Sequence, residues 1–119
     1  MEEGAEAFES IGQLGADGIE IEAADVSKLW EHFNSYEAEA QALLDQWKLL
    51  IGDEETPAKE KLRFPLMSTY ELALKCSNLF NVLDARGAIS VTERVGMIGR
   101  IRNLSVGVAK AYAAQQVIV

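Results

Sequence analysis

The chain has 119 residues and a mass of 13.1 kDa, and 49% of its residues are hydrophobic and 25% charged. This composition is typical of one globular domain with a single core, and it excludes wholesale disorder. No apolar run approaches the roughly 18 residues that cross a bilayer, and the acidic start is unlike a basic targeting sequence, so we expect a cytoplasmic protein.

The net charge of −8 is unevenly divided along the chain. Residues 1–60 contain sixteen Asp and Glu against three Lys, whereas residues 61–119 contain eight Lys and Arg against three acids. This asymmetry would let an acidic partner or a polyanion meet the second half. Attraction between the two halves within the fold is an equal alternative, because charge counts do not set geometry.

Residues 1–24 are predicted to be an extended or disordered acidic lead-in, because they hold four of the nine glycines and many acids. From Asp25, a candidate N-cap, apolar residues recur at a spacing of three and four. This periodicity predicts a helix near residues 25–48. Its apolar positions are Val26, Leu29, Trp30, Phe33, Tyr36, Ala40, Leu43, Leu44 and Trp47.

Residues 49–67 are predicted to form an acidic connecting loop, since Pro57 follows three consecutive acids there. A second helix is expected near residues 68–86. Ser68 and Glu71 have the spacing of a capping box, in which each side chain would satisfy a backbone amide at the helix start.

Gly87 can adopt the left-handed conformation that ends the second helix. Ser90 and Glu93 repeat the capping-box spacing and open a third helix near residues 90–115. Val91, Val95, Ile98 and Tyr112 are expected to widen the apolar stripe of this helix. We therefore predict an all-α fold, a three-helix antiparallel bundle over residues 25–116.

Neither the cysteine nor the histidine indicates a reactive centre. Cys76 lies among apolar residues and is interpreted as a small buried hydrophobe. His32 has no other His or Cys nearby, so we predict no metal site. No Ser/His/Asp or Cys/His set is present, and we predict no catalytic residues in this chain.

Three stretches in the second half carry a family resemblance. Residues 77–94 read SNLFNVLDARGAISVTER, residues 98–104 read IGRIRNL, and residues 108–112 read VAKAY. This succession resembles the signature near the C-terminus of the α subunit of bacterial-type glycyl-tRNA synthetase. Residues 24–48 resemble the preceding helix of that family, so matches in the same order cover residues 24–48 and 66–115.

The resemblance implies a C-terminal helical domain that follows a class II catalytic core in an α2β2 glycine–tRNA ligase. In that family the core binds ATP with Mg, glycine and the tRNA acceptor end. We therefore expect this chain to hold no cofactor and to be inactive alone. The expected partners are the β subunit and the α catalytic core, with tRNA-Gly met only indirectly and no contact with membrane or DNA.

Polar side chains are concentrated at the turn between the second and third predicted helices. A docking platform for the β subunit or the catalytic core is one interpretation, because arginine offers planar bidentate pairing. Internal use as helix caps and turn ion pairs is the alternative. The candidate interface residues are Asn81, Asp84, Arg86, Glu93 and Arg94.

The basic residues Arg100, Arg102 and Lys110 on the third helix are candidates for contact with tRNA or a partner. They scatter over a broad arc, and Tyr112 is the one aromatic residue of this helix, so base stacking is poorly supported. The alternative is that these basic residues lie on the water-facing side of the helix and bind nothing. For the whole chain, a stand-alone helical adaptor for protein–protein interaction is the alternative to a synthetase assembly domain.

Overall fold

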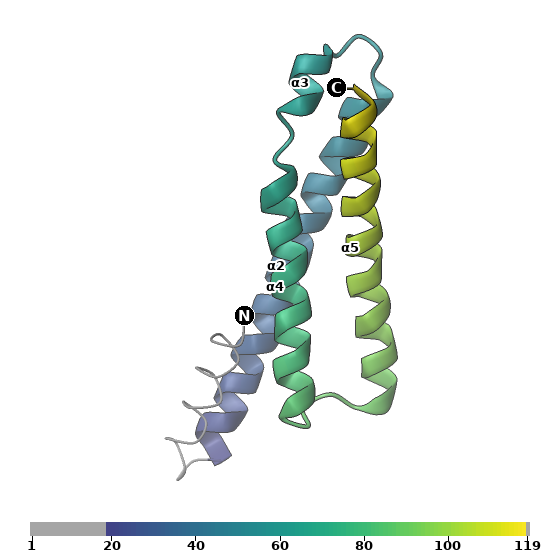
Figure 1. The fold of residues 1–119 in the computed structure, drawn as a ribbon. Helices are drawn as coiled ribbons and strands as arrows, with labels where there is room; N and C mark the ends of the chain where they lie inside the picture. Colours follow the sequence, from purple (N-terminus) through teal and green to yellow (C-terminus); the bar gives the residue numbers. More distant parts are fainter. Residues whose placement is uncertain (1–18, 119) are drawn as a thin grey trace.

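The computed structural model describes residues 19–118, with side chains from residue 26 onward, and every regular element in this part of the chain is a helix. The all-α prediction is therefore confirmed. Figure 1 shows the elements in chain order, and residues 1–18 of the predicted lead-in lie outside the described residues. The helices are α2 (Ile19–Gly52), α3 (Ala58–Leu62), α4 (Leu66–Ala85) and α5 (Val91–Ile118).

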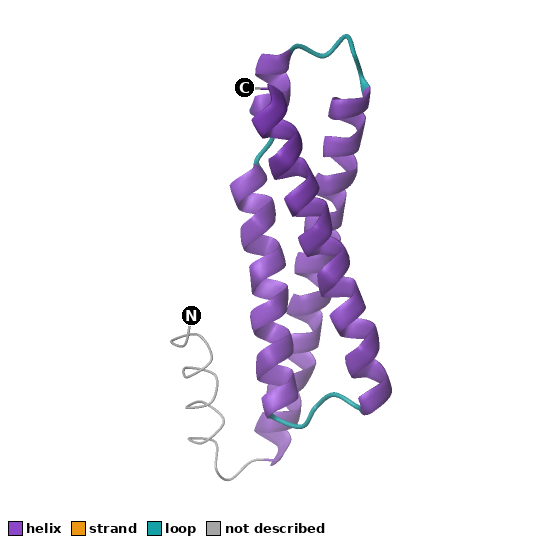
Figure 2. Ribbon diagram, turned by 45° about the vertical axis from the view of Figure 1, so that its right-hand side comes forward, coloured by secondary structure: helices purple, strands orange, loops and turns teal. Residues whose placement is uncertain are grey.

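The three long helices form an elongated bundle in which α4 runs antiparallel to both α2 and α5 (Figures 1 and 2). The most extensive interface joins α2 to α4, and α5 packs mainly on α4 and along less of α2. The short α3 crosses the end of the bundle where α2 finishes and touches α2 and α5. This is the predicted three-helix antiparallel bundle with one added turn of helix.

The main apolar core runs along the axis of the bundle, because each long helix turns apolar residues inward. The second cluster, at the α3 end, contains Trp47, Phe64 and Ala111, with the rings of Trp47 and Phe64 5.2 Å apart. These contacts hold the loop after α3 against the bundle. The main cluster consists of Leu29, Phe33, Ala40, Leu44, Leu72, Ala73, Cys76, Leu79, Val82, Leu83, Met97, Leu104 and Val108.

Two predicted helix starts are wrong. The backbone is already helical at Ile19, so Asp25 lies inside α2 and is not its N-cap; the Glu and Ala of residues 20–24 are good helix formers and extend the helix backward. The N-cap of α4 is Pro65 and not Ser68. The carbonyl of Pro65 accepts the first helical hydrogen bond, from the backbone N–H of Thr69 at 3.0 Å, which places Ser68 and Glu71 within the helix.

The predicted loop over residues 49–67 is shorter than expected and partly helical. α2 continues to Gly52, α3 occupies Ala58–Leu62, and α4 begins at Leu66. Asp53 organises the bend after α2, because its side chain accepts hydrogen bonds from the backbone of Glu55 and the hydroxyl of Thr56, both at 2.9 Å. Both hydrogen bonds also lower the pKa of the Asp53 carboxyl, and the one from Thr56 has the larger effect.

The turn from α4 to α5 is built as the sequence predicts. Gly87 has a φ of 70°, the left-handed conformation that glycine adopts most readily. The backbone N–H of Gly87 donates to the carbonyl of Asp84 and that of Ala88 to the carbonyl of Leu83, which is the Schellman pattern of a helix end. Ser90 and Glu93 form reciprocal capping-box hydrogen bonds of 2.9 and 3.1 Å.

In the described part of the chain, no helix is both long enough and apolar enough to cross a membrane.

Candidate functional site

The polar turn proposed as a docking platform is largely engaged in internal contacts. Arg94 on α5 donates a 2.7 Å hydrogen bond to the carboxylate of Asp84 on α4, and Glu93 caps its own helix. Asn81 is exposed and Arg86 is half-buried. The turn therefore uses its charged residues to join α4 to α5, which is the internal interpretation of this cluster.

The basic residues of α5 do not form one surface. Arg100 turns toward α2, where its guanidinium donates 2.8 Å hydrogen bonds to the Glu37 carboxylate and to the side-chain oxygen of Asn34. It also lies 4.8 Å from the centre of the Phe33 ring. Arg100 is therefore engaged within the bundle, while Arg102 and Lys110 are exposed to solvent, and contact of these residues with tRNA or a partner stays a prediction.

The pairing with Glu37 favours the charged form of Arg100. The hydrogen bond between the two side chains raises the pKa of the Arg100 guanidinium. Burial acts in the opposite direction but is the smaller effect. Sequence reasoning missed this pair because its partners lie 63 residues apart in the chain.

Cys76 is buried, as the sequence indicates, and His32 lies at the surface. Cys76 is fully buried, and burial raises the pKa of its thiol to about 11, with the nearby carboxylate of Glu37 adding to the shift. His32 is exposed beside the ring of Tyr36. Within residues 19–118 no group of three His, Cys, Asp or Glu side chains could hold a metal ion.

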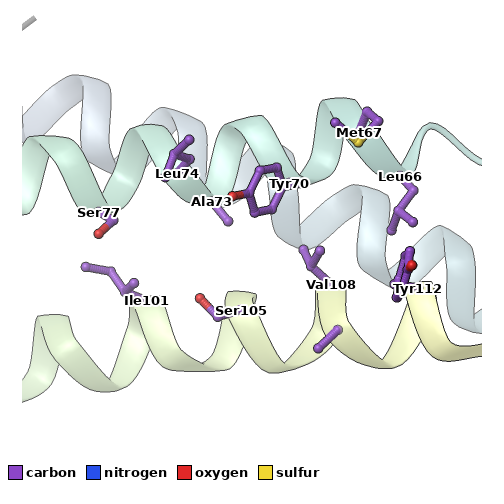
Figure 3. Close-up of a pocket in the computed structure, with 11 residues that line it drawn as sticks. Leu66, Met67, Tyr70, Ala73, Leu74, Ser77, Ile101, Ser105, Val108 and Tyr112 are labelled. Atoms are coloured by element: carbon purple, nitrogen blue, oxygen red, sulfur yellow. The ribbon is translucent and has the colours of Figure 1, made fainter. Parts of the chain in front are cut away.

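An apolar groove of about 460 Å³ lies between α4 and α5. Figure 3 shows side chains from both helices lining it, with Tyr70 and Leu74 on α4 across from Ser105 and Ile101 on α5. The lining contains no charged residue. It consists of Leu66, Met67, Tyr70, Ala73, Leu74, Ser77, Ile101, Ser105, Val108, Ala109 and Tyr112.

The groove belongs to a wider apolar face on the outside of α4 and α5. Val91 and Val95, which we expected to widen the inward stripe of α5, are 82% and 70% exposed. Beyond its few charged residues, α5 is apolar or small around most of its circumference, a pattern typical of a helix that is covered on several sides. We call this surface the α4–α5 face, formed by Met67, Tyr70, Leu74, Val91, Val95, Ile98, Val106 and Tyr112.

The fold and this surface define the class of protein: a helical bundle domain with one open apolar face. The family model of the glycyl-tRNA synthetase alpha subunit matches residues 14–117, and the chain belongs to this family. The family confirms the resemblance in the sequence and supports a role in charging tRNA with glycine, in association with other synthetase subunits. No solved structure matches the chain.

Proposed function

We propose that this segment is a non-catalytic helical assembly domain of a cytoplasmic glycine–tRNA ligase, and that its α4–α5 face packs against another chain of the enzyme. The observation that carries the proposal is that the eight large apolar side chains of this face on α4 and α5 are exposed to solvent. Monomeric soluble proteins rarely expose contiguous apolar surfaces of more than a few hundred Å², and larger ones commonly mark sites of interaction. The partners we propose are the β subunit and other α chains with their catalytic region.

The charged residues of the bundle support a structural use of the segment. Asp84, Glu93 and Arg100 are each engaged in capping a helix or joining two helices. ATP, Mg and glycine would then be held by the catalytic region of the family, and tRNA-Gly would be met only indirectly. Of the three candidate basic residues of α5, Arg100 is engaged with α2, so a direct tRNA contact would depend on Arg102 and Lys110.

The test is binding of the purified chain to the α subunit and, separately, to the β subunit of the cognate glycyl-tRNA synthetase, measured by calorimetry. Leu74→Glu places a charge within the α4–α5 face, where truncation or charging of a central apolar contact weakens binding by about tenfold or more. Leu49→Glu is the matched control, because Leu49 is 76% exposed on α2 and outside the face.

We expect the original chain and Leu49→Glu to bind at least one of the two subunits equally well, and Leu74→Glu to bind it much more weakly. Binding to neither subunit, or equal binding by all three proteins, would contradict the proposed function. Helicity measured by circular dichroism should be the same for the three proteins, because both leucines are exposed.

A further inference from the structure

A basic residue lies within the apolar α4–α5 face. Arg102 comes one helical turn after Ile98 and one turn before Val106, so it shares the outward side of α5 with them. Arg102 is exposed, and it forms no ion pair with another described residue. A segment that covers this part of the face should therefore present carboxylates together with apolar side chains, because covering a cation without an opposite charge is unfavourable.

The first eighteen residues of the chain have this composition. Three large apolar residues, Phe8, Ile11 and Leu14, follow one another there at a spacing of three. The same segment has no Lys or Arg, so each of its apolar anchors has acids and no bases near it in the sequence. Its acids are Glu2, Glu3, Glu6, Glu9 and Asp17.

The segment is joined to the bundle near one end of the face. α2 begins at Ile19, at the same end of the bundle as the α4–α5 turn, and the face begins there with Val91 (Figure 1). The apolar groove begins at Ile101, about 15 Å further along α5. Phe8 precedes Ile19 by eleven residues, which span up to about 36 Å when extended, and the two shorter extents of the molecule are 28 and 18 Å. Phe8 can therefore reach the groove.

We propose that, in the absence of another chain, residues 1–18 occupy the α4–α5 face of their own bundle, with Phe8, Ile11 and Leu14 against its apolar side chains and their acids near Arg102. Because the segment is tethered to α2, it meets the face at an effective concentration on the order of millimolar, and a contact with a dissociation constant of about 1 mM is then half formed. Another chain of the enzyme has to displace the segment, which weakens the apparent affinity of that chain.

Paramagnetic relaxation enhancement in the full chain tests the proposal. A nitroxide is attached at Ser10→Cys, within the segment, and the native thiol of Cys76 is fully buried and so takes up little label. We expect the amide signals of Val95 and Ile98, on the face, to broaden strongly.

The control signal comes from Ser35, which is exposed on the outward side of α2. Its neighbour Asn34 is bonded to Arg100, so Ser35 lies near the level of Ile98 in the bundle but on the opposite side. Ser35 should broaden much less than Ile98. A mixture of labelled chain and isotope-enriched unlabelled chain should show no broadening at Ile98, and broadening in this mixture equal to that in the labelled chain would overturn a contact within one chain.

Charge variants test the role of Arg102. Arg102→Glu should lower the broadening at Ile98 by about twofold to fivefold, the range expected for an exposed charge pair, and the combined change Glu6→Lys and Glu9→Lys should do the same. All three changes together should restore most of the broadening, because the swapped charges again attract. Lys110→Glu is the matched control, since Lys110 is an exposed base of α5 outside the face. Equal broadening in every variant overturns Arg102 as a contact of the segment.

The outcomes separate this inference from the proposed function. Broadening at Ile98 no greater than at Ser35 overturns the segment as the occupant, and if that chain still binds a subunit through Leu74, the assembly function stands. If Ile98 broadens and neither subunit binds, the segment is the occupant and the assembly function fails. Where both hold, Phe8→Ser with Ile11→Ser should tighten subunit binding by about threefold to tenfold, because less of the face is covered. Unchanged subunit affinity in that variant overturns competition for one face.

Discussion

Arg100 joins two helices through three kinds of contact. Its guanidinium is bonded to the Glu37 carboxylate and the Asn34 side chain, and its flat face lies over Phe33 in the core. The planar fork of arginine suits this arrangement, whereas a lysine would offer one flexible point charge. α5 shares a smaller interface with α2 than with α4, and the Arg100 cluster adds hydrogen bonds across it.

Arg100→Ala should therefore lower the free energy of unfolding by about 1–2 kcal/mol, a modest value because the ion pair is partly open to solvent. Arg100→Lys should recover only part of that loss. Lys110→Ala, which removes an exposed cation from the same helix, should change stability by less than about 0.5 kcal/mol. Urea denaturation gives the values, and equal effects of Arg100→Ala and Lys110→Ala would contradict the role of the Arg100 cluster.

The reactivity of the buried Cys76 thiol reports how often the core of the bundle opens. The thiolate is the reactive form of cysteine, and with a pKa of about 11 and no exposed surface Cys76 has little thiolate and no access to reagent at pH 8. We expect a disulfide reagent to label the native chain much more slowly than the chain in urea, with a rate set by transient opening of the bundle. Rapid labelling of the native chain would show that the α2–α4 interface is loose.

Local sequence signals predicted the helices better than their ends. The spacing of apolar residues located the three long helices, and Gly87, Ser90 and Glu93 located the α4–α5 turn, since these effects act within a few residues. The start of α4 was mispredicted because Ser68 matched a capping motif, while the chain uses Pro65. The motif describes hydrogen bonds that could form at Ser68. Phe64 packs against Trp47 and Ala111 just before α4, and the helix begins directly after it.

The candidate surface was harder to predict than the fold. The pairing of Arg100 with Glu37, and the exposure of Val91 and Val95, depend on how α5 is rotated about its axis against two other helices. The sequence of α5 carries apolar residues around most of its circumference and so leaves that rotation open. The same feature is the signal for the α4–α5 face, because apolar residues on all sides of a helix indicate more than one covered side.

The capping box at the start of α5 can be tested by a single substitution. Ser90→Ala removes the hydroxyl that accepts the 3.1 Å hydrogen bond from the backbone N–H of Glu93, and loss of an N-cap side chain costs about 1 kcal/mol. Ser68→Ala is the matched control, since Ser68 is exposed within α4 and caps nothing. Equal denaturation midpoints for Ser90→Ala and the original chain would show that the cap does not contribute to stability.

α2 and α5 approach each other closely at Gly107. A Cβ added there would lie 2.7 Å from Cδ1 of Leu44, whereas one added at Gly96 meets nothing within 4 Å. Both positions are inside α5, where alanine is favoured over glycine by about 1 kcal/mol. We expect Gly96→Ala to raise stability by about 0.5–1 kcal/mol and Gly107→Ala to give less than that, because the buried Leu44 must shift. An equal gain at both positions in urea denaturation would contradict the close helix contact.

At the scale of the whole molecule, the bundle separates two kinds of surface. Exposed acids such as Glu31, Glu39 and Asp45 lie on α2, and the apolar face lies on α4 and α5. The acidic surface keeps the chain in solution, while the apolar face is free to pack against another chain. The division of charge seen in the sequence thus corresponds in part to different faces of the fold, and in part, through Arg100 and Glu37, to attraction between them.

The assembly proposal predicts the catalytic behaviour of the purified chain. Glycine activation needs groups that hold the phosphates of ATP and polarise the carboxylate of glycine, whereas the charged residues of this bundle at Asp84, Arg94 and Arg100 are paired with each other or with α2. We therefore expect residues 1–119 alone to show no glycine-dependent exchange of pyrophosphate into ATP. The cognate α subunit assayed in parallel is the positive control. Exchange by the chain that exceeds a no-protein blank and is abolished by omitting glycine would show that the bundle itself performs chemistry and would replace the assembly function with an enzymatic one.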